Sequence, residues 1–446
     1  LTITGRNDWS STLPKANRSY FYPGFTGSFV FTELLPKDLK DIISFGKFRA
    51  GWGKTGNDAP WYSTSTVYAQ AAANGSGWGE VNFPLAGVNA FTLSNIMGND
   101  KLKPEMTTEW ELGLNMAFLR NRLSFDFAYY NRSTNNQTLA MNLDPGTGYT
   151  RRYVNIGEVT NKGIELLIQG TPIKTRDWQW DLNMNWTLNR SKVVSLPKEL
   201  GTEIAIFGFS GGTGLYAVKG KPLGMYKAQK LERDPEGHVV VAANTGLPVK
   251  DSKYEYCGDM NHKYTLGWGT TLRWKDISLT ANMEARVGGK MYTRTKGTVF
   301  FTGIAKQTVY NDRKPFIVPN SVNKVTAADG SVSYVENTTA LDYNYIQSYW
   351  ADQYDCDASD LVSRGFVKLR DVAVTWSLPK KWIDKTFLTG ASISFFGRNL
   401  LMWTPSDNTF VDPENSSMSG DLAAMFGEYG ANPSTRSYGF NIKISF

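Results

Sequence analysis

The sequence predicts an all-β protein, a transmembrane antiparallel β-barrel with about twelve strands in residues 1–446. In the stretch 436–446, RSYGFNIKISF, aromatic and aliphatic residues alternate with polar ones and glycine. Side chains of a strand point to opposite faces in turn, so this stretch has one apolar and one polar face. The same alternation recurs along the chain. Short and long connections also alternate, as they do in outer-membrane barrels.

Composition excludes a helical membrane protein. No run of about eighteen apolar residues occurs, which rules out a transmembrane helix. The mean hydropathy of -0.35 does not argue against a barrel, because the apolar and polar residues that alternate along each strand average to an intermediate hydropathy. The net charge is +7, with Lys and Arg scattered through predicted loops and turns. We therefore expect solvated loops in contact with anionic outer-membrane lipid such as lipopolysaccharide, and no nucleic-acid partner.

The first three expected strands are 1–7, 20–35 and 47–56. The first reads LTITGRN, and the second is followed by the polar connection PKDLKD. A long loop rich in Gly, Asn, Trp and Tyr follows the third strand, to about residue 106. Such residues favour irregular structure between strands.

The next four expected strands are 107–119, 123–129, 164–169 and 178–189. In the last of them, Trp178, Trp180, Leu182 and further apolar residues alternate with polar ones. Its length suits a tilted strand, which needs about ten residues to cross a bilayer. The turns at 120–121 and 174–177 are short, and a loop from the fifth strand to about residue 159 separates them.

The last five expected strands are 264–274, 277–287, 365–378, 391–403 and 436–446. A tight turn at 275–276 joins the first two, and long loops cover 193–260 and about 288–363. Counting back from the last strand, the short turns after strands two, four, six, eight and ten all fall on the periplasmic side. Short periplasmic turns and long extracellular loops are typical of outer-membrane barrels.

The polar faces of these strands predict a polar interior. Such an interior is either a water channel or a surface that grips an internal plug. The inward residues are Glu109, Glu111, Asp126, Glu165, Asp181, Asn183, Asn185, Glu284 and Arg286.

Catalytic chemistry finds little support in the sequence. The two histidines, His238 and His262, lack a serine motif that would complete a hydrolase triad and lack metal-ligand spacing. Segments 355–360 and 412–417 could hold calcium loosely, but hydrogen-bonded turns are the simpler interpretation. We expect no catalytic residue, no metal site and no cofactor. Cys257 and Cys356 either form a disulfide between long loops or remain two free thiols.

Aromatic residues are concentrated in the two largest loop regions. Exposed aromatic rings bind sugar faces or partner proteins by burying flat apolar area. The alternative is that these rings pack the loops against each other. The candidate ligand contacts are Trp61, Tyr62, Trp78, Tyr349, Trp350 and Tyr354.

Several motifs, in order along the whole chain, resemble the SusC-like (SusC/RagA) TonB-dependent transporters of Bacteroidota. They are LTITGRNDWSSTLP, NRSYFYPGFTGSFVFTE, FRAGWGKTGN, LKPEMTTEWELGLNMAFLRNRLSFDFAYYNRST, NIGEVTNKGIELLIQG, GFVKLRDVAVTWSLP and SFFGRNLLMWT with VDPE. Each motif alone would be weak, whereas the ordered set is specific. The resemblance implies that residues 1–446 form the last twelve strands of a 22-stranded barrel.

The resemblance also implies a function, active nutrient uptake across the outer membrane. Its expected partners are a SusD-like surface lipoprotein as a lid, the TonB complex as energy source, and a plug-bearing N-terminal portion or second chain. The ligands would be oligosaccharides or oligopeptides, and transporter–lipoprotein pairs would form dimers. Two alternatives remain: a self-contained twelve-stranded pore or outer-membrane enzyme, and a structural or adhesive protein.

Overall fold

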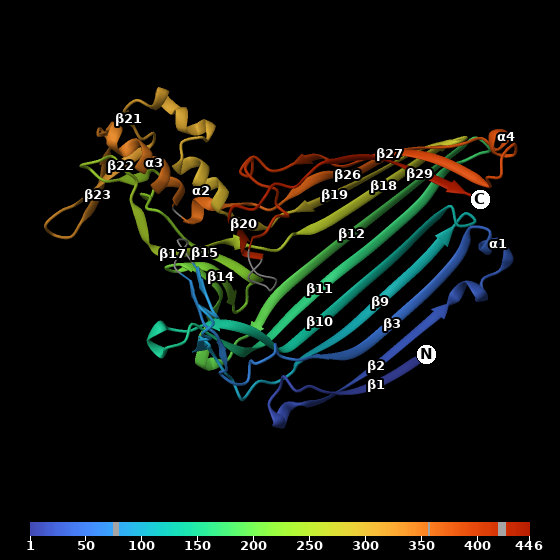
Figure 1. Cartoon of the computed structure of the whole chain (residues 1–446), viewed down its shortest axis with the longest axis horizontal. Helices are drawn as coiled ribbons and strands as arrows, with labels where there is room; N and C mark the ends of the chain where they lie inside the picture. The colour runs from blue at the N-terminus through green and yellow to red at the C-terminus, as the bar shows by residue number, and fades with distance from the viewer. Residues whose placement is uncertain (75–79, 356, 418–424) are drawn as a thin grey trace.

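Twelve long strands form one antiparallel sheet that curves into an open trough (Figure 1). The computed structural model describes residues 1–446 except 75–79, 356 and 418–424. Each long strand pairs with the next long strand in the chain. The strands are β1 (Thr2–Trp9), β2 (Ser19–Val30), β3 (Ile43–Asn57), β9 (Glu105–Phe118), β10 (Leu123–Asn142), β11 (Arg151–Lys174), β12 (Trp178–Ser195), β18 (Tyr264–Trp274), β19 (Ile277–Val287), β26 (Phe366–Ser377), β27 (Gly390–Trp403) and β29 (Ser437–Ser445). The predicted fold class is confirmed.

The sheet has two unlike rims. The connections 31–42, 119–122, 175–177, 275–276 and 378–389 meet at one rim, here called the short-turn rim. It carries the single-turn helices α1 (Lys37–Lys40) and α4 (Lys380–Ile383), on the right of Figure 1. The opposite, long-loop rim carries the large connections 58–104, 196–263, 288–365 and 404–436.

The outer face of the sheet is apolar and exposed. Phe440 and Ile442 on the last strand are 66% and 59% exposed, and Phe395 beside them is 60% exposed. An apolar surface of this extent is not stable against water, so it must face lipid or another protein. Further exposed members are Phe25, Phe29, Phe48, Trp110, Leu112, Trp178, Trp274, Leu279 and Val374.

The second strand is shorter than the sequence predicted. β2 ends at Val30, and Phe31–Leu34 forms a 3₁₀ turn, η2, ahead of Pro36. Thr32 is buried, and its Oγ1 accepts a hydrogen bond from the backbone N–H of Gly46 at 3.2 Å. This contact folds the segment back onto β3, so the chain cannot remain extended to residue 35.

The β10–β11 hairpin is longer than predicted. The expected loop between the fifth and sixth strands is mostly strand, with β10 reaching Asn142 and β11 starting at Arg151. Residues 131–138, NRSTNNQT, are polar on both faces. A strand that has left the lipid no longer needs an apolar face, so hydrophobic alternation cannot reveal it.

The long connections, predicted as loops, fold into small sheets and helices at the long-loop rim. Two helices, α2 (Arg294–Phe301) and α3 (Tyr343–Asp355), lie there on the left of Figure 1. Three small sheets form there: β13 (Glu203–Ser210), β14 (Thr213–Val218), β15 (Leu223–Leu231) and β17 (Lys250–Asp259); β16 (Val239–Val241), β22 (Ser321–Thr326) and β23 (Val332–Glu336); and β20 (Lys290–Thr293), β25 (Leu361–Ser363) and β28 (Gly427–Glu428). Three further pairs are β4 (Tyr68–Gln70) with β7 (Phe91–Leu93), β5 (Ala72–Asn74) with β6 (Glu80–Asn82), and β21 (Phe316–Ile317) with β24 (Ala340–Leu341). The short strand β8 (Ile96–Met97) lies beside β11. The further 3₁₀ turns are η1 (Lys15–Asn17), η3 (Pro145–Thr147), η4 (Lys198–Leu200), η5 (Lys306–Arg313) and η6 (Asp357–Asp360).

The buried apolar clusters lie at this rim, between connections that are far apart in sequence. One cluster joins Ile156 and Val193 of the long strands to Ile204 of β13. A second packs Tyr226 and Tyr292 around Phe426, which is fully buried. None of the helices in the described part of the chain has the length and apolar composition of a membrane span.

Candidate functional site: the polar interior and its mouth

The inner face of the sheet is lined with polar side chains that contact one another across strands. The strand register places all the predicted inward residues on this one face. Arg49 of β3 donates to Glu111 Oε1 at 3.2 Å and to Asp126 Oδ1 at 2.7 Å, across β9 and β10. Asn115 Nδ2 donates to Asp126 Oδ2 at 3.0 Å. Gly113 makes room for this cluster, because a Cβ there would lie 2.3 Å from Arg49 Nε.

Asparagines and glycines continue the same surface over β12, β18 and β19. A Cβ on Gly267 would lie 2.2 Å from Asn185 Oδ1. A Cβ on Gly269 would lie 2.4 Å from Asn282 Oδ1 and 2.7 Å from Asn183 Nδ2. The glycines of YTLGWGTTLRW therefore let amides lie flat against the backbone of β18. The inner face is hydrophilic and closely packed.

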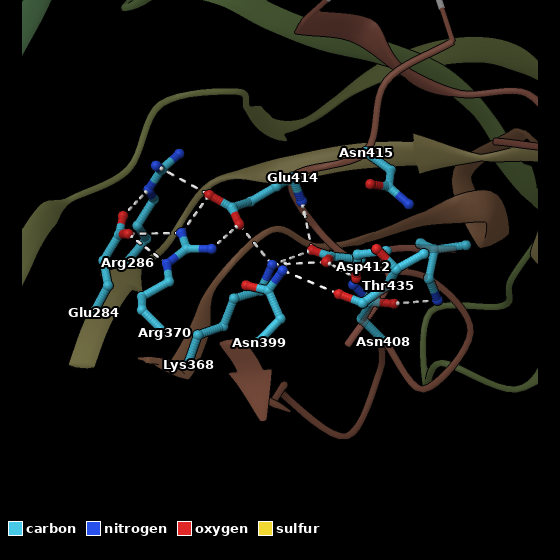
Figure 2. A network of polar contacts seen from close by, with 12 residues as sticks. Glu284, Arg286, Lys368, Arg370, Asn399, Asn408, Asp412, Glu414, Asn415 and Thr435 are labelled. Carbon is cyan, nitrogen blue, oxygen red and sulfur yellow. Dashed lines mark hydrogen bonds and ion pairs between the residues drawn. The ribbon is translucent and has the colours of Figure 1, made fainter. Parts of the chain in front are cut away.

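A network of six charged residues closes the inner face at the long-loop rim (Figure 2). Lys368 of β26 donates to both oxygens of Asp412, at 2.6 and 2.7 Å, and to Glu414 Oε2 at 2.5 Å. Arg370 donates to Glu414 at 2.6 Å and to Glu284 of β19 at 2.6 and 2.8 Å. Arg286 completes the set, 2.8 Å from Glu284 and 3.1 Å from Glu414. Three cations thus balance three carboxylates.

A β-bulge aims Arg370 into this network. The pairing of β19 with β26 shifts register between Leu369 and Asp371. Arg370 is the extra residue, so it joins Lys368 and Asp371 on the inner face while Leu369 stays outside. Two adjacent charged residues within KLRDV signalled this bulge in the sequence, but our sequence analysis did not use the signal. It likewise missed Lys368 and Glu414.

Two carboxylates of the network, Asp412 and Glu414, are held in their charged form. Burial raises the pKa of Glu414, but hydrogen bonds from Arg370 and Lys368 outweigh it and lower the pKa to about 2. Burial likewise opposes ionisation of Asp412, and hydrogen bonds from Lys368 and Ser434 bring its pKa below the usual range. The side chains of Lys368 and Asp412 are only 5% and 4% exposed. This ion pair is therefore buried, and its members depend on each other.

The network fastens the connection between β27 and β29 over the mouth of the trough. Three amides reinforce it from the same connection and its neighbours (Figure 2). Asn408 Nδ2 donates to Ser363 O at 3.1 Å, Asn399 Nδ2 to Thr435 O at 3.1 Å, and Asn415 Nδ2 to Asn432 O at 2.8 Å. The segment 412–417, considered above as a loose calcium loop, is thus a turn whose Asp412 is neutralised by Lys368.

The predicted aromatic contacts divide into three groups. Trp61 and Tyr62 are 78% and 66% exposed, with ring centroids 5.8 Å apart. Tyr349 and Trp350 are 6% and 8% exposed and belong to a buried cluster of α3 with Phe300 of α2. For this buried pair the alternative, that the rings pack the loops together, agrees with the structure. Trp78 and the side chain of Tyr354 lie outside the described residues.

The cysteines and histidines occupy separate places at the long-loop rim. Cys257 lies half-buried on β17, and Cys356 lies outside the described residues, so the disulfide stays a prediction. Asp234, Glu236 and His238 bring ligand-type atoms within 4.8 Å of one another. Asp234 is already engaged there, since it accepts from two backbone N–H groups and lies 2.8 Å from His238 Nδ1. This geometry is a hydrogen-bonded turn.

Comparison with known proteins identifies the kind of barrel. The family model described as "TonB dependent receptor-like, beta-barrel" matches residues 1–224, half of the chain. TonB-dependent receptor P3 of Formosa agariphila is 26% identical over 477 residues, which cover 100% of this chain and 44% of the relative. SusC of Bacteroides thetaiotaomicron, a TonB-dependent receptor, is 32% identical over 206 residues, 44% of this chain and 19% of SusC.

Solved structures share the fold. A structure described as the RagAB peptide importer in the 'closed-closed' state has a TM-score of 0.70 at 20% identity. A second, of the RagAB peptide transporter, has a TM-score of 0.70 at 21% identity. Each match covers 100% of this chain and 45% of the solved chain. The chain thus spans less than half the length of the relatives it matches end to end.

Proposed function

Residues 1–446 belong to the family of TonB-dependent receptor-like β-barrels, and we propose that they form the C-terminal barrel portion of a SusC-type nutrient importer. Barrels of this family lie in the outer membrane, and the chain is not an enzyme. The observation that carries the proposal is one sheet with an apolar outer face and an ion-paired inner face. The outer face contacts lipid, the long-loop rim is extracellular and the short-turn rim is periplasmic.

Further strands must complete the barrel. Among the described residues, β1 pairs only with β2 and β29 only with β27 in the sheet. An unpaired backbone group in lipid costs several kcal/mol, so two open edges are not stable in a bilayer. We propose that an N-terminal portion or a second chain supplies a plug and the remaining strands. With the twelve strands of this sheet, they complete a barrel of 22 strands. The polar inner face, rich in paired charges, suits contact with a folded plug better than an open water channel.

The ligand enters from the long-loop rim in this proposal. A SusD-like surface lipoprotein covers that rim as a lid, and the TonB complex supplies energy from the periplasm. Two such transporter–lipoprotein pairs form a dimer. The ligand is an oligosaccharide or an oligopeptide, and the solved relatives described as peptide importers favour the peptide. Of the aromatic candidates whose side chains the structure describes, Trp61 and Tyr62 have the exposure needed to bind the ligand or the lid.

Uptake by cells carrying the whole protein tests the proposal. Cells are supplied with a labelled oligopeptide mixture or a labelled oligosaccharide mixture, with and without a protonophore. An importer takes up one mixture, and the protonophore abolishes that uptake. Uptake that ignores the protonophore would identify a passive pore, and unchanged uptake after gene deletion would exclude transport.

Exposed aromatics are tested in the same assay. We expect a Trp61→Ala, Tyr62→Ala double variant to lower uptake at limiting ligand by about thirtyfold, because each ring buries flat apolar area worth about 1 kcal/mol. Phe387→Ala is the matched control, since Phe387 is 84% exposed on the opposite rim. Equal uptake by the double variant and the control would remove these residues from the ligand path.

A further inference from the structure

An apolar groove crosses the outer face of the sheet beside the short-turn rim. Its volume is about 930 Å³, within the range of small-molecule sites. It runs over β10, β11, β12 and β18. The strand register shows that it opens on the outer face, because Ile168 lies opposite Met184 and Met184 opposite Trp268, all on the side away from the luminal asparagines. The apolar walls are Leu119, Leu123, Ile168, Leu182, Met184 and Trp268.

A glycine creates the groove. Gly170 of β11 lies between Leu123 of β10 and Leu182 of β12, on the outer face. The next residues, Thr171 and Pro172, fall in a register shift, so the regular pairing of β11 with β12 is interrupted there. A Cβ on Gly170 would find its nearest neighbour, Leu123 Cδ1, at 3.7 Å, an ordinary contact. The space over Gly170 is therefore open, and a larger side chain would fit into it.

Two arginines stand at the periplasmic end of the groove. Arg120 lies in the turn Leu119-Arg120-Asn121, whose φ values of 50°, 57° and 64° are all left-handed. Its side chain is 86% exposed, and its ion pair with Asp41 is long, at 4.0 Å. Arg122 donates to the carbonyl oxygens of Thr171 and Pro172, at 3.3 and 2.9 Å. These two hydrogen bonds hold the Arg122 guanidinium in place. Because carbonyl oxygens carry no formal charge, they do not neutralise its positive charge.

The same rim has the composition of a membrane interface. Trp178 and Trp274 lie side by side across β12 and β18, with ring centroids 5.9 Å apart and planes tilted by 31°, and Lys275 Nζ lies 5.5 Å from the Trp274 ring centre. Aromatic belts mark the headgroup level of a bilayer. The short-turn segments hold nine basic residues, Lys37, Lys40, Arg120, Arg122, Arg176, Lys275, Lys380, Lys381 and Lys385, against six acidic ones, Glu33, Asp38, Asp41, Asp177, Asp276 and Asp384. The rim is thus a positive surface at headgroup level.

We propose that this groove binds one anionic phospholipid of the periplasmic leaflet. The lipid phosphate pairs with Arg120 and Arg122, and an acyl chain lies over Gly170 against Leu182 and Met184. The apolar walls require an acyl chain, which a free phosphate lacks, and lipopolysaccharide belongs to the leaflet at the other rim. The proposal rests on the membrane orientation proposed above but not on transport itself, because the bound lipid contacts the outer face and not the lumen.

Native mass spectrometry of the complete transporter complex tests the site. The complex is extracted in detergent, delipidated and titrated with dioleoyl phosphatidylglycerol or dioleoyl phosphatidylethanolamine. We expect one phosphatidylglycerol to bind about 25-fold more tightly than the zwitterionic lipid, since each of the two arginines near the membrane surface is worth about fivefold for an anionic lipid. Equal binding of the two lipids would overturn the proposal.

Variants separate the two halves of the site. Arg120→Asn keeps a residue that tolerates the left-handed turn and should weaken phosphatidylglycerol about fivefold. Gly170→Leu should fill the groove and abolish the preferred site for both lipids. Lys275→Asn is the matched control, because it removes the same charge from another left-handed turn position, at φ 51°, away from the groove.

The three variants distinguish a specific site in the groove from binding by the general charge of the rim. Weaker phosphatidylglycerol binding in Arg120→Asn and loss of binding in Gly170→Leu, with Lys275→Asn like wild type, support the site. If all three variants lose binding equally, lipid is held by the general charge of the rim and the proposal is wrong. If Gly170→Leu prevents assembly, Arg120→Asn, a surface change, still decides the outcome against Lys275→Asn.

Discussion

Replacing Lys368 with methionine should release the connection between β27 and β29 from the barrel mouth. The change removes two hydrogen bonds to Asp412 and one to Glu414. Glu414 keeps Arg370 and Arg286 as partners. Asp412 keeps neutral donors, Ser434 Oγ at 2.6 Å and the backbone N–H of Glu414 at 3.0 Å. The cost therefore falls on Asp412, a buried carboxylate left without a cation.

The size of the effect follows from this burial. Removing one partner of a buried ion pair typically costs about 3–5 kcal/mol, because the remaining charge is stranded in a poorly solvated place. Each 1.4 kcal/mol is a factor of ten in an equilibrium. Local opening of residues 404–417 should thus become at least a hundredfold more frequent in Lys368→Met. In a Lys368→Met, Asp412→Leu double variant most of the loss should be recovered, because no charge is left unpaired.

Hydrogen exchange on the intact complex measures this opening. Amide protection of peptides within 404–417 should fall in Lys368→Met, return in the double variant, and stay unchanged in Lys324→Met. Lys324 is the control because its ion pair with Glu232, at 2.7 Å, is partly exposed and screened by solvent, so it contributes little. Wild-type protection in Lys368→Met would show that the ion network does not hold this connection.

Three further predictions follow from single contacts. Burial, and then the positive charge of Arg364, lower the pKa of His262 to about 4, so the neutral imidazole contributes fully to the free energy of unfolding above about pH 6.5, and this contribution is lost as the pH falls towards 4. The thermal midpoint of the complex should therefore drop between pH 7.5 and 5 in wild type and drop less in His262→Gln. Equal drops in the two proteins would refute this. Gly113→Val should displace Arg49 from its two carboxylates and lower the thermal midpoint of the complex by a few degrees, since a Cβ would lie 2.3 Å from Nε; an unchanged midpoint would contradict the packing. If Cys257 and Cys356 form the predicted disulfide, denatured protein takes up no alkylating reagent until it is reduced, and alkylation of both thiols without reduction would disprove the bond.

The sequence by itself determined the membrane-spanning sheet. The inner and outer faces follow from alternation with period two, which is a local property of the chain. Strand direction and the side of each turn follow from the alternation of short and long connections. Residues such as Glu111 and Asp126 could be placed on the inner face for that reason. The alternation of apolar and polar residues ends where the strands leave the lipid. For this reason the sequence predicts a loop for the part of the β10–β11 hairpin that lies at the long-loop rim.

Only the tertiary structure decided what the connections do. Tyr349 and Trp350 look like exposed loop aromatics in the sequence, yet contacts with Phe300, about fifty residues away, bury them. The pairing of Lys368 with Asp412 depends on a bulge and on a connection that folds back over the mouth, neither of which has a periodic signature. Such contacts join residues distant in sequence, and the free energy that fixes them comes from burial and charge pairing in the assembled structure rather than from local preference.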